Sequence, residues 1–261
     1  MSAISSPVSK IRRLLILPPL VCHIVAGVSM ANILCFFAPK MVVRRFIVAW
    51  MRILLRLLRV KIILHGRFVK APVLMVANHV SWLDIPVLLA LTQPDMVSKK
   101  ELRDWPCLGR PAQKVGTLFL SRGDAEDSRL LSNQIAFFLT QGRKIAIFPE
   151  GTTSNGRIVK RFYPRLFQAA IYAKAPIQPV AICYTDPYNC LHDQAPFIGD
   201  DDLLSHLWRF LASEKTIVHV HALPALSSTE SSRRLLADKA QHAILSTLAS
   251  YLKEPTQRHL P

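Results

Sequence analysis

Residues 72–86 read PVLMVANHVSWLDIP, and this stretch decides the fold. It opens with a short apolar run, 72–78, which predicts a buried strand. Polar residues follow at once, and the apolar residues after them predict a helix. A strand that leads through a short polar turn into a helix is the repeating unit of α/β folds, and functional sites collect at the end of such a strand.

Outward from this stretch, short apolar runs alternate with amphipathic segments from Lys61 onward. The alternation predicts an α/β domain over residues 61–261 with a single, mostly parallel and largely buried sheet. Six segments are candidate strands: KIILH (61–65), PVLMVAN (72–78), GTLFLSR (116–122), KIAIFPE (144–150), IQPVAICY (177–184) and TIVHVHAL (216–223). Helices are expected at 124–141, which has acidic residues in its first turn, and at 231–252.

The N-terminal segment 14–39 contains no Asp, Glu, Lys or Arg. Its length permits a helix to cross a hydrocarbon core of about 30 Å. Because proline disrupts a helix interior, Pro18 and Pro19 predict that the helix begins after them. The shorter stretch that remains either spans the bilayer or enters one leaflet. A cleaved signal peptide is not favoured, because no small-residue cleavage site with a polar start follows.

The next segment, 41–60, has arginines on one narrow helical face and mostly apolar residues on the others. The four arginines are Arg45, Arg52, Arg56 and Arg59. Such a helix fits the plane of a membrane interface, although a buried helix with one solvated stripe would show the same pattern. Together with the preceding apolar run, it predicts a membrane-associated helical pair over residues 1–60.

Positive charge is concentrated in the same part of the chain. The formal net charge is +16, and the first 83 residues hold twelve Lys or Arg and no Asp or Glu, so they carry +12 of it. A basic and apolar segment is attracted to an anionic lipid surface. Nucleic acid is not an expected partner, because the basic residues interrupt runs of Leu, Ile and Val instead of lying on a polar scaffold with aromatic platforms.

Several kinds of site are excluded by missing motifs. The five cysteines show no C-x-x-C spacing, and no ligand set stands at helical spacing, so neither a disulfide framework nor a metal site is expected. His219 and His221 merely alternate on one predicted strand. The absence of G-x-S-x-G, P-loop and G-x-G-x-x-G motifs argues against a serine esterase or a nucleotide-binding enzyme, and no cofactor is expected.

The polar turn after the strand offers a pair of groups for acyl transfer. His79 lies at the strand end, and Asp84 can fold back to bind one ring nitrogen if the helix starts after the histidine. The other nitrogen then faces a substrate hydroxyl, which needs a base to become a good nucleophile. Asn78 is expected to cap the helix. A capping or core histidine is the commoner fate, but His79 alone among the nine histidines has Asp at this offset.

A second polar turn, FPEGTTS (148–154), follows the apolar run IAIF. Pro149 ends the strand, and Gly151 with the hydroxyls after it forms a turn that can present backbone N–H groups to an anion. Glu150 would be fixed at the strand tip, where it could hydrogen-bond a polyol acceptor. An ordinary exit from a strand would look similar, so this turn indicates function only together with other motifs.

Four motifs occur in order: NHVSWLD (78–84), GTLFLSR (116–122), FPEGT (148–152) and IQPVAI (177–182). As a set they resemble the lysophosphatidate acyltransferase (1-acylglycerol-3-phosphate O-acyltransferase) family of glycerolipid acyltransferases, over about residues 60–190. The resemblance implies a membrane-bound acyltransferase in which His79 is the general base and Asp84 orients it. It also implies direct transfer from donor to acceptor, without a covalent acyl-enzyme.

The same resemblance implies substrate-binding residues and partners. The polar end of the acceptor would be bound by Arg122, Glu150, Gly151 and Thr152, with Lys100 as a cation of the active site. The expected acyl donor is acyl carrier protein or coenzyme A loaded with a fatty acid, and the expected acceptor is a lysolipid. The expected location is the cytoplasmic face of the inner membrane of a bacterium.

Two departures from the family pattern bear on the acceptor. Members that take lysophosphatidate commonly read FPEGTRS with a later F-K pair, whereas this chain has Thr153 and Tyr163 at those places. Two phosphate-binding cations are thus missing, although basic residues lie nearby: Arg157, Lys160, Arg161 and Arg165. The family favours 1-acylglycerol-3-phosphate, which gives phosphatidate, and the departures favour lyso-ornithine lipid. A non-catalytic lipid-binding membrane protein is the third hypothesis. It predicts broken motifs, whereas the His79–Asp84 motif and the FPEGT motif are both intact.

Overall fold

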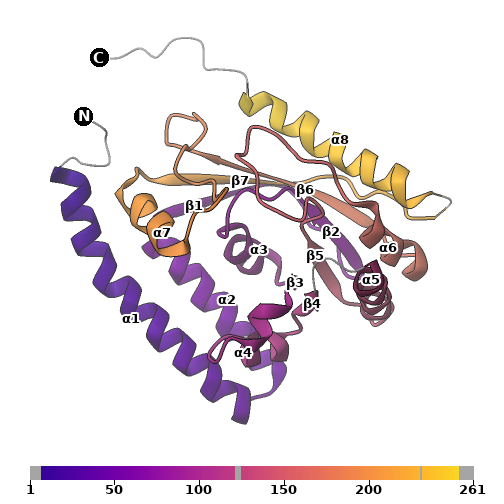
Figure 1. Ribbon diagram of the computed structural model, residues 1–261, viewed down its shortest axis with the longest axis horizontal. Coiled ribbons are helices and arrows are strands. Elements are labelled where there is room, and N and C mark those ends of the chain that lie inside the picture. The colour runs from indigo at the N-terminus through magenta and orange to yellow at the C-terminus, as the bar shows by residue number, and fades with distance from the viewer. Residues whose placement is uncertain (1–6, 121–124, 230, 253–261) are drawn as a thin grey trace.

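The computed structural model describes residues 7–120, 125–229 and 231–252. Its centre is one seven-stranded sheet in the order β1-β7-β6-β2-β5-β3-β4 (Figure 1). The strands are β1 (Val60–Gly66), β2 (Val73–Ala77), β3 (Asp95–Lys99), β4 (Leu118–Leu120), β5 (Lys144–Ile147), β6 (Ile177–Thr185) and β7 (Thr216–Ala222). Among these described strands, neighbours are parallel except β6 with β7. The predicted α/β domain with a mostly parallel sheet is therefore confirmed.

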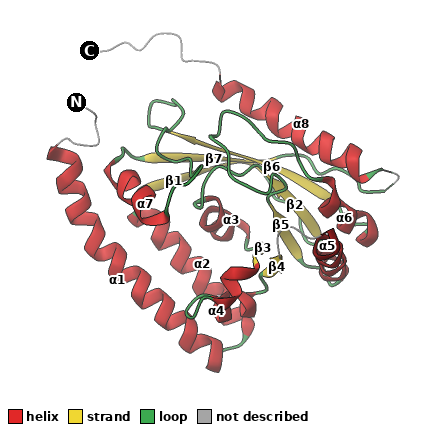
Figure 2. Ribbon diagram, in the orientation of Figure 1, coloured by secondary structure: helices red, strands yellow, loops and turns green. Residues whose placement is uncertain are grey.

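Helices cover both faces of the sheet (Figure 2). They are α1 (Pro7–Phe37), α2 (Lys40–Leu57), α3 (Asp84–Thr92), α4 (Gly109–Val115), α5 (Ala125–Thr140), α6 (Gln168–Ala173), α7 (Leu203–Ala212) and α8 (Arg233–Leu252), with the 3-10 helices η2 (Lys100–Asp104) and η3 (Pro164–Phe167). One apolar core lies between the sheet and α5, α6 and α8, and the other between the sheet and α1, α2, α3 and α7. Burial of these two clusters is the main force that holds the layers together.

Strand β3 is the element that the pattern of apolar runs does not reveal. It reads DMVSK, and its first residue, Asp95, is buried. Two guanidinium groups accompany this carboxylate: Arg44 Nη1 lies 2.8 Å from Asp95 Oδ1, and Arg143 Nε donates to Oδ2. A buried carboxylate is tolerated when it is paired and hydrogen-bonded. The polar start of the strand thus depends on partners that are distant in the sequence.

Strand β4 is shorter than the predicted strand 116–122. Helix α4 ends at Gly116, which has a φ of +107°, and the pairing of β4 with β3 begins at Leu118. Glycine adopts such a φ at a helix end without a Cβ penalty. The predicted Arg122 falls in residues 121–124, outside the described part of the chain.

Helix α1 is continuous, so the prediction that it begins after Pro18 and Pro19 is wrong. Both prolines are exposed, while Leu17 and Leu20 on either side of them pack into the apolar core beside α7. This packing keeps the segments before and after the prolines in one helix, although the two prolines lack backbone N–H donors. The span Lys10–Phe37 is long and apolar enough to cross a membrane and is mostly exposed, which supports membrane association.

Helix α2 follows α1 after a tight turn and packs against it. It buries Val43, Ile47 and Leu55 against the domain. The four arginines that were predicted to share a face are all exposed: Arg45, Arg52, Arg56 and Arg59. The N-terminal helical pair is therefore confirmed. Its position in a membrane interface, and the division of the chain into units 1–60 and 61–261, stay predictions.

A group of histidines lies where β1, β7 and α8 meet. The His65 and His221 rings stack with centroids 4.2 Å apart, and His65 Nε2 lies 3.1 Å from His219 Nδ1. His221 Nε2 lies 3.0 Å from the hydroxyl of Tyr251 on α8. Burial, and then the neighbouring His65 and His219, lowers the pKa of His221 to about 4. This ring is therefore neutral in the folded protein at neutral pH.

Acid is expected to weaken the fold through this group. Because the pKa of His221 lies below its ordinary value of 6.5, the unfolded chain binds more protons as the pH falls from 6.5 to about 4, and stability falls over that window. The thermal unfolding midpoint should drop when the pH is lowered through this range. His221→Phe should reduce the drop, whereas the exposed His242→Phe should not. Equal drops in both variants would contradict this account.

Candidate active site

The two polar turns meet at the carboxyl ends of β2 and β5, which are neighbouring parallel strands. Asn78 does not cap α3 as predicted, since the residue before that helix is Leu83. Its amide nitrogen donates to the Ile182 carbonyl at 2.9 Å, and its amide oxygen accepts from the Ile182 N–H at 2.7 Å. The ladder between β2 and β6 ends at Ala77. Asn78 continues that ladder with its side chain, so the side chain is not free for capping.

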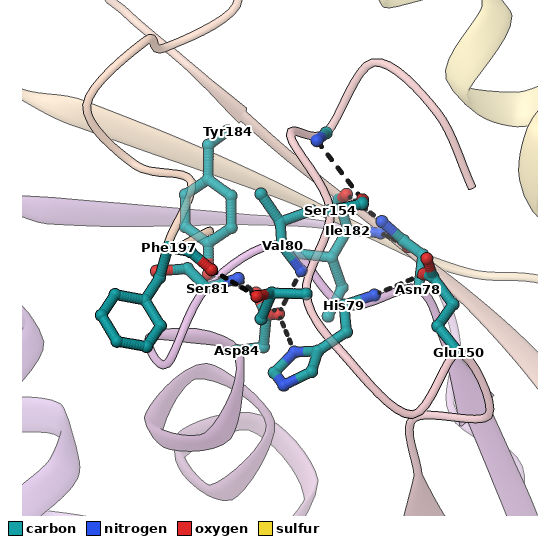
Figure 3. A network of polar contacts seen from close by, with 12 residues as sticks. Asn78, His79, Val80, Ser81, Asp84, Glu150, Ser154, Ile182, Tyr184 and Phe197 are labelled. Carbon is teal, nitrogen blue, oxygen red and sulfur yellow. Dashed lines mark hydrogen bonds and ion pairs between the residues drawn. The ribbon is translucent and has the colours of Figure 1, made fainter. Parts of the chain in front are cut away.

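Asp84, the first residue of α3, is fully buried. Its Oδ2 accepts from His79 Nδ1 at 2.7 Å and from the N–H groups of Val80 and Ser81 at 2.8 and 3.0 Å (Figure 3). Its Oδ1 accepts from the Tyr184 hydroxyl at 2.6 Å. Burial, with the Asp84 charge in addition, raises the pKa of Tyr184 well above its ordinary value, so the phenol keeps its proton and donates. Together these donors hold the carboxylate in one position.

The His79 ring is held on two sides. Its Nδ1 is bound to Asp84, and its face stacks on Phe148 with centroids 4.0 Å apart and planes 13° apart. Figure 3 shows the other nitrogen, Nε2, on the side of the ring away from Asp84. No described residue hydrogen-bonds to Nε2, and the side chain is 18% exposed. With Nδ1–H donated to the carboxylate, Nε2 carries the lone pair that a general base needs.

Glu150 joins the two turns through the backbone. Its Oε1 accepts from the His79 N–H and its Oε2 from the Lys160 N–H, each at 2.8 Å, and the residue is only 2% exposed. The His79 carbonyl in turn accepts from the Ser154 N–H at 2.8 Å. Burial raises the pKa of Glu150, and the two backbone hydrogen bonds oppose this rise. The carboxylate predicted to bind the acceptor is thus already bound to backbone groups on both oxygens.

The outer part of the FPEGT turn is open to solvent. Gly151 has a φ of +69°, and both Gly151 and Thr152 are exposed. A Cβ on Gly151 would lie 3.3 Å from the ring of Tyr163, so this ring covers one side of the turn. The Thr153 hydroxyl donates to the Phe197 carbonyl, and its own carbonyl accepts from Lys160 Nζ at 3.0 Å. This turn is where an acceptor's polar end can reach the protein beside His79.

Of the predicted cations, Lys100 does not contact the His79–Asp84 pair, and Arg122 lies outside the described residues. Lys100 is exposed on η2, and no interaction within the described residues joins it to that pair. The four basic residues near the FPEGT turn are exposed as well: Arg157, Lys160, Arg161 and Arg165. Arg157 lies 3.5 Å from Asp193, a carboxylate that is itself exposed. The binding roles expected for Lys100, Arg122, Gly151 and Thr152 remain predictions.

Two residues of the site have no assigned role in the motifs. Tyr184 closes the segment IQPVAICY, and Phe148 opens FPEGT. The sequence does indicate that the Tyr184 hydroxyl has a hydrogen-bond partner, because a phenol on a mostly apolar strand needs one when it is buried. Nothing in the sequence identifies that partner as Asp84. Phe148 resembles any other apolar strand residue until the structure places its ring against His79.

A mostly apolar cavity of about 200 Å³ lies apart from the His79–Asp84 pair, and neither residue of the pair lines it. It lies between α2, α3, β3 and α4, and its lining includes Ile47, Met51, Ile85, Leu89, Leu108 and Pro111. Ile85 directly follows Asp84 in α3. Apolar walls of this kind suit a hydrocarbon chain rather than a polar ligand.

Known proteins are similar to this chain over most of its length. Residues 59–183 match the family model named Acyltransferase. The chain is 46% identical over 195 residues to the lyso-ornithine lipid O-acyltransferase of Pseudomonas aeruginosa, which covers 75% of each chain. It is 34% identical over 178 residues to the 1-acyl-sn-glycerol-3-phosphate acyltransferase of Neisseria meningitidis, which covers 68% of this chain and 69% of that one.

The fold is shared with a solved structure, that of the 1-acyl-sn-glycerophosphate acyltransferase of Thermotoga maritima. The TM-score is 0.69 at 19% identity, covering 95% of this chain and 100% of that one. At this identity the likeness shows the fold alone. The two curated relatives show more, because each is over 30% identical to this chain and covers more than two thirds of it. The chain therefore belongs to the Acyltransferase family, as a lysolipid O-acyltransferase.

Proposed function

We propose that this protein is a lyso-ornithine lipid O-acyltransferase. It would transfer a fatty acyl chain from a thioester donor to the free hydroxyl of lyso-ornithine lipid. The observation that carries the proposal is the 46% identity to the Pseudomonas aeruginosa enzyme of that name over 75% of both chains. The acceptor that the motifs favour first, 1-acylglycerol-3-phosphate, has weaker support, because the Neisseria meningitidis relative is 34% identical.

The surroundings of the FPEGT turn support the same acceptor. The Thr153 hydroxyl donates a hydrogen bond to the Phe197 carbonyl, and the ring of Tyr163 lies against Gly151. Neither side chain is a cation, whereas a phosphate monoester is dianionic and is bound best by Arg or Lys. An ornithine headgroup offers one carboxylate and one ammonium group instead. Uncharged side chains at these two places therefore suit a headgroup without phosphate.

The proposed mechanism uses His79 as the base. As the acceptor hydroxyl attacks the thioester carbonyl, its proton passes to Nε2, and the adjacent Asp84 carboxylate stabilises the imidazolium that forms. The new C–O bond forms, the C–S bond breaks, and the proton on Nε2 passes to the leaving thiolate. Tyr184 and two backbone N–H groups keep the carboxylate fixed throughout. Transfer is direct, so no acyl-enzyme is needed.

Substrate binding is proposed to use both sides of the His79–Asp84 pair. The polar end of the acceptor would lie over Gly151 and Thr152, with Arg122 and Lys100 as cations of the site. Glu150 would act through the His79 backbone that it holds. An acyl chain would occupy the apolar cavity beside α3, the helix that begins at Asp84. The donor would be acyl-acyl carrier protein or acyl-coenzyme A, since both are anionic and suit a basic protein.

The helical pair supports a proposed location at the cytoplasmic face of a bacterial inner membrane. Helix α1 presents an apolar surface, and the exposed arginines follow on α2. A base that works on a membrane lipid must lie near the bilayer surface, where the lipid hydroxyl is found. Acyl thioesters reach that surface from the cytoplasm.

Mass spectrometry of reaction products tests the proposed acceptor. Purified protein is offered a mixture of lyso-ornithine lipid, lysophosphatidate and lysophosphatidylethanolamine, with either acyl-acyl carrier protein or acyl-coenzyme A. The expected product is ornithine lipid, which gains one ester-linked acyl chain. Phosphatidate as the main product would overturn the proposed acceptor but would leave the acyltransferase mechanism standing.

Thr153→Arg is expected to raise the use of lysophosphatidate relative to lyso-ornithine lipid by about tenfold, because one charge-assisted hydrogen bond to phosphate is worth roughly 1.5–3 kcal/mol. The measurement is the ratio of kcat/KM for the two acceptors. Thr153→Ser is the matched control, since it keeps a hydroxyl for the Phe197 carbonyl. An unchanged ratio in Thr153→Arg would show that this position does not choose the headgroup.

A further inference from the structure

Arg13 on α1 is a buried cation without a counterion in the described structure. The residue is 8% exposed, and its Nε and Nη2 atoms are shielded from solvent with no hydrogen-bond acceptor among the described residues. Its guanidinium carbon lies 4.5 Å from the centre of the Trp208 ring on α7. Stacking on an aromatic face stabilises a guanidinium but leaves its N–H groups unsatisfied. Buried unsatisfied donors are rare, and an absent anion is one explanation for them.

Helix α7 is fixed firmly against the N-terminal half of α1 (Figure 1). Leu20 of α1 packs with Phe210 and Leu211 of α7 in one apolar core. Arg12 Nη1 donates to the Ala212 carbonyl at 3.0 Å and also to the Ser213 carbonyl, so it caps the end of α7. The neighbouring residues Arg12 and Arg13 therefore have different tasks. Arg12 hydrogen-bonds the end of α7, whereas Nε and Nη2 of Arg13 have no acceptor among the described residues.

Exposed apolar side chains lie on α1 and α7 close in sequence to Arg13 and Trp208, and we call them the α1–α7 patch. Its members are Ile11, Leu14 and Leu15 on α1 and Leu203, Leu204 and Trp208 on α7. Leu14 and Leu204 are 74% and 77% exposed, which is extreme for leucine. The patch continues the exposed apolar surface of α1. That helix is long and apolar enough to cross a membrane, so a membrane is the expected partner of this surface.

Cations flank the α1 side of the patch, whereas Asp200, Asp201 and Asp202 precede Leu203 on its α7 side. Lys10, Arg12 and Arg13 lie in the first turns of α1. Arg59 follows the end of α2, and its pKa is lowered first by burial and then by the charge of Arg12, while Glu214 opposes the shift. Cations at the edge of an apolar surface match the phosphate layer of an anionic leaflet.

We propose that α7 is a third membrane-contacting helix and that Arg13, stacked on Trp208, binds the phosphate of an anionic phospholipid. The α1–α7 patch enters the acyl region beside that lipid, and the guanidinium, whose Nε and Nη2 atoms have no acceptor among the described residues, turns on the Trp208 ring to meet the phosphate. This site is separate from the site of acyl transfer, and it does not depend on which lysolipid is the acceptor. It lets the enzyme distinguish an anionic leaflet from a neutral one.

Quenching of tryptophan fluorescence by brominated lipids tests the proposal. The full chain is reconstituted with vesicles of phosphatidylcholine alone, or of phosphatidylcholine with an equal part of phosphatidylglycerol, in which one lipid at a time carries the bromine. The protein has four tryptophans, so the contribution of Trp208 is the difference between the wild type and Trp208→Phe. Brominated phosphatidylglycerol should quench Trp208 more strongly than brominated phosphatidylcholine, and Arg13→Gln should remove this preference.

Flotation of the same vesicles gives a second measurement. Arg13→Gln should lower the partition ratio between anionic and neutral vesicles about fivefold, the typical contribution of one cation at an anionic surface. Arg234→Gln, an exposed arginine on α8, is the matched change and should lower it less. Arg13→Lys should recover part of the preference. The thermal unfolding midpoint of each variant in detergent establishes whether Arg13→Gln is folded, and if it is not, Trp208→Leu replaces it in flotation, while quenching rests on the wild type and Arg13→Lys.

Three results would overturn the proposal. Equal quenching of Trp208 by the two brominated lipids would mean that no anionic lipid is selected at this place. An unchanged partition ratio in folded Arg13→Gln would mean that the guanidinium plays no part. Stabilisation of the wild type by inorganic phosphate in detergent, lost in Arg13→Gln, would mean that the site takes a soluble anion rather than a lipid.

Discussion

Replacing His79 with alanine is expected to lower kcat/KM for acyl transfer by about 10³-fold, because the reaction loses the group that takes the proton from the acceptor hydroxyl. The imidazole also donates to Asp84 and stacks on Phe148, but the Asp84 carboxylate keeps its donors from Val80, Ser81 and Tyr184 in the variant. The backbone N–H and carbonyl of His79, which bind Glu150 and Ser154, remain in the variant. The measurement is the rate of ester formation with purified variant and wild type at equal concentrations.

Folding and membrane association should survive His79→Ala. The side chain is partly exposed and lies outside both apolar cores, so the unfolding midpoint and flotation with vesicles should match the wild type. His242→Ala, an exposed histidine on α8, is the control and should keep full activity. A folded His79→Ala protein that retains wild-type turnover would remove the proposed mechanism.

Asp84→Asn is expected to lower kcat by about 10²- to 10³-fold with little loss of stability. The amide oxygen can still accept from His79 Nδ1 and the two backbone N–H groups, and the amide nitrogen can donate to the Tyr184 oxygen. Every hydrogen bond thus has a replacement. What is lost is the negative charge that stabilises the imidazolium as it forms, so the loss should fall on kcat.

Tyr184→Phe tests how much the position of the Asp84 carboxylate contributes to catalysis while its negative charge is kept. It keeps the Asp84 carboxylate and removes one of its donors. We expect a fall in kcat of about tenfold, because a hydrogen bond to a charged group is worth roughly 1.5–3 kcal/mol. A larger loss of kcat in Tyr184→Phe than in Asp84→Asn would contradict the assignment of Tyr184 as a positioning residue.

The sequence predicts well those features that depend on local pattern. The strands that end at the polar turns are apolar runs followed by turn residues, and the His79–Asp84 offset needs only a helix that starts after the histidine. Strand β3 could not be predicted in this way, because its buried Asp95 relies on Arg44 and Arg143, which are distant in the sequence. Helix α1 likewise continues through Pro18 because of packing that no local rule contains.

The candidate site shows the same division. Glu150 stands at a strand tip in both sequence and structure, but the pattern cannot say whether its carboxylate faces a substrate or the backbone. Only the meeting of β2 and β5 brings the His79 N–H to one of its oxygens. Tyr184 reaches Asp84 for a similar reason, since β6 is the neighbour of β2 on the other side.

The pairing of β1 with β7 has a consequence for how the chain is made. Strand β1 follows directly on the helical pair, yet its neighbour in the sheet is the last strand to be synthesised. During synthesis β1 therefore has no strand partner, and nearly the whole domain must be translated before β7 can pair with it. A chain truncated before residue 216 would keep the helical pair but lack β7, so the edge of β1 would stay unpaired. Such an edge favours aggregation, and we expect the truncated chain to be degraded.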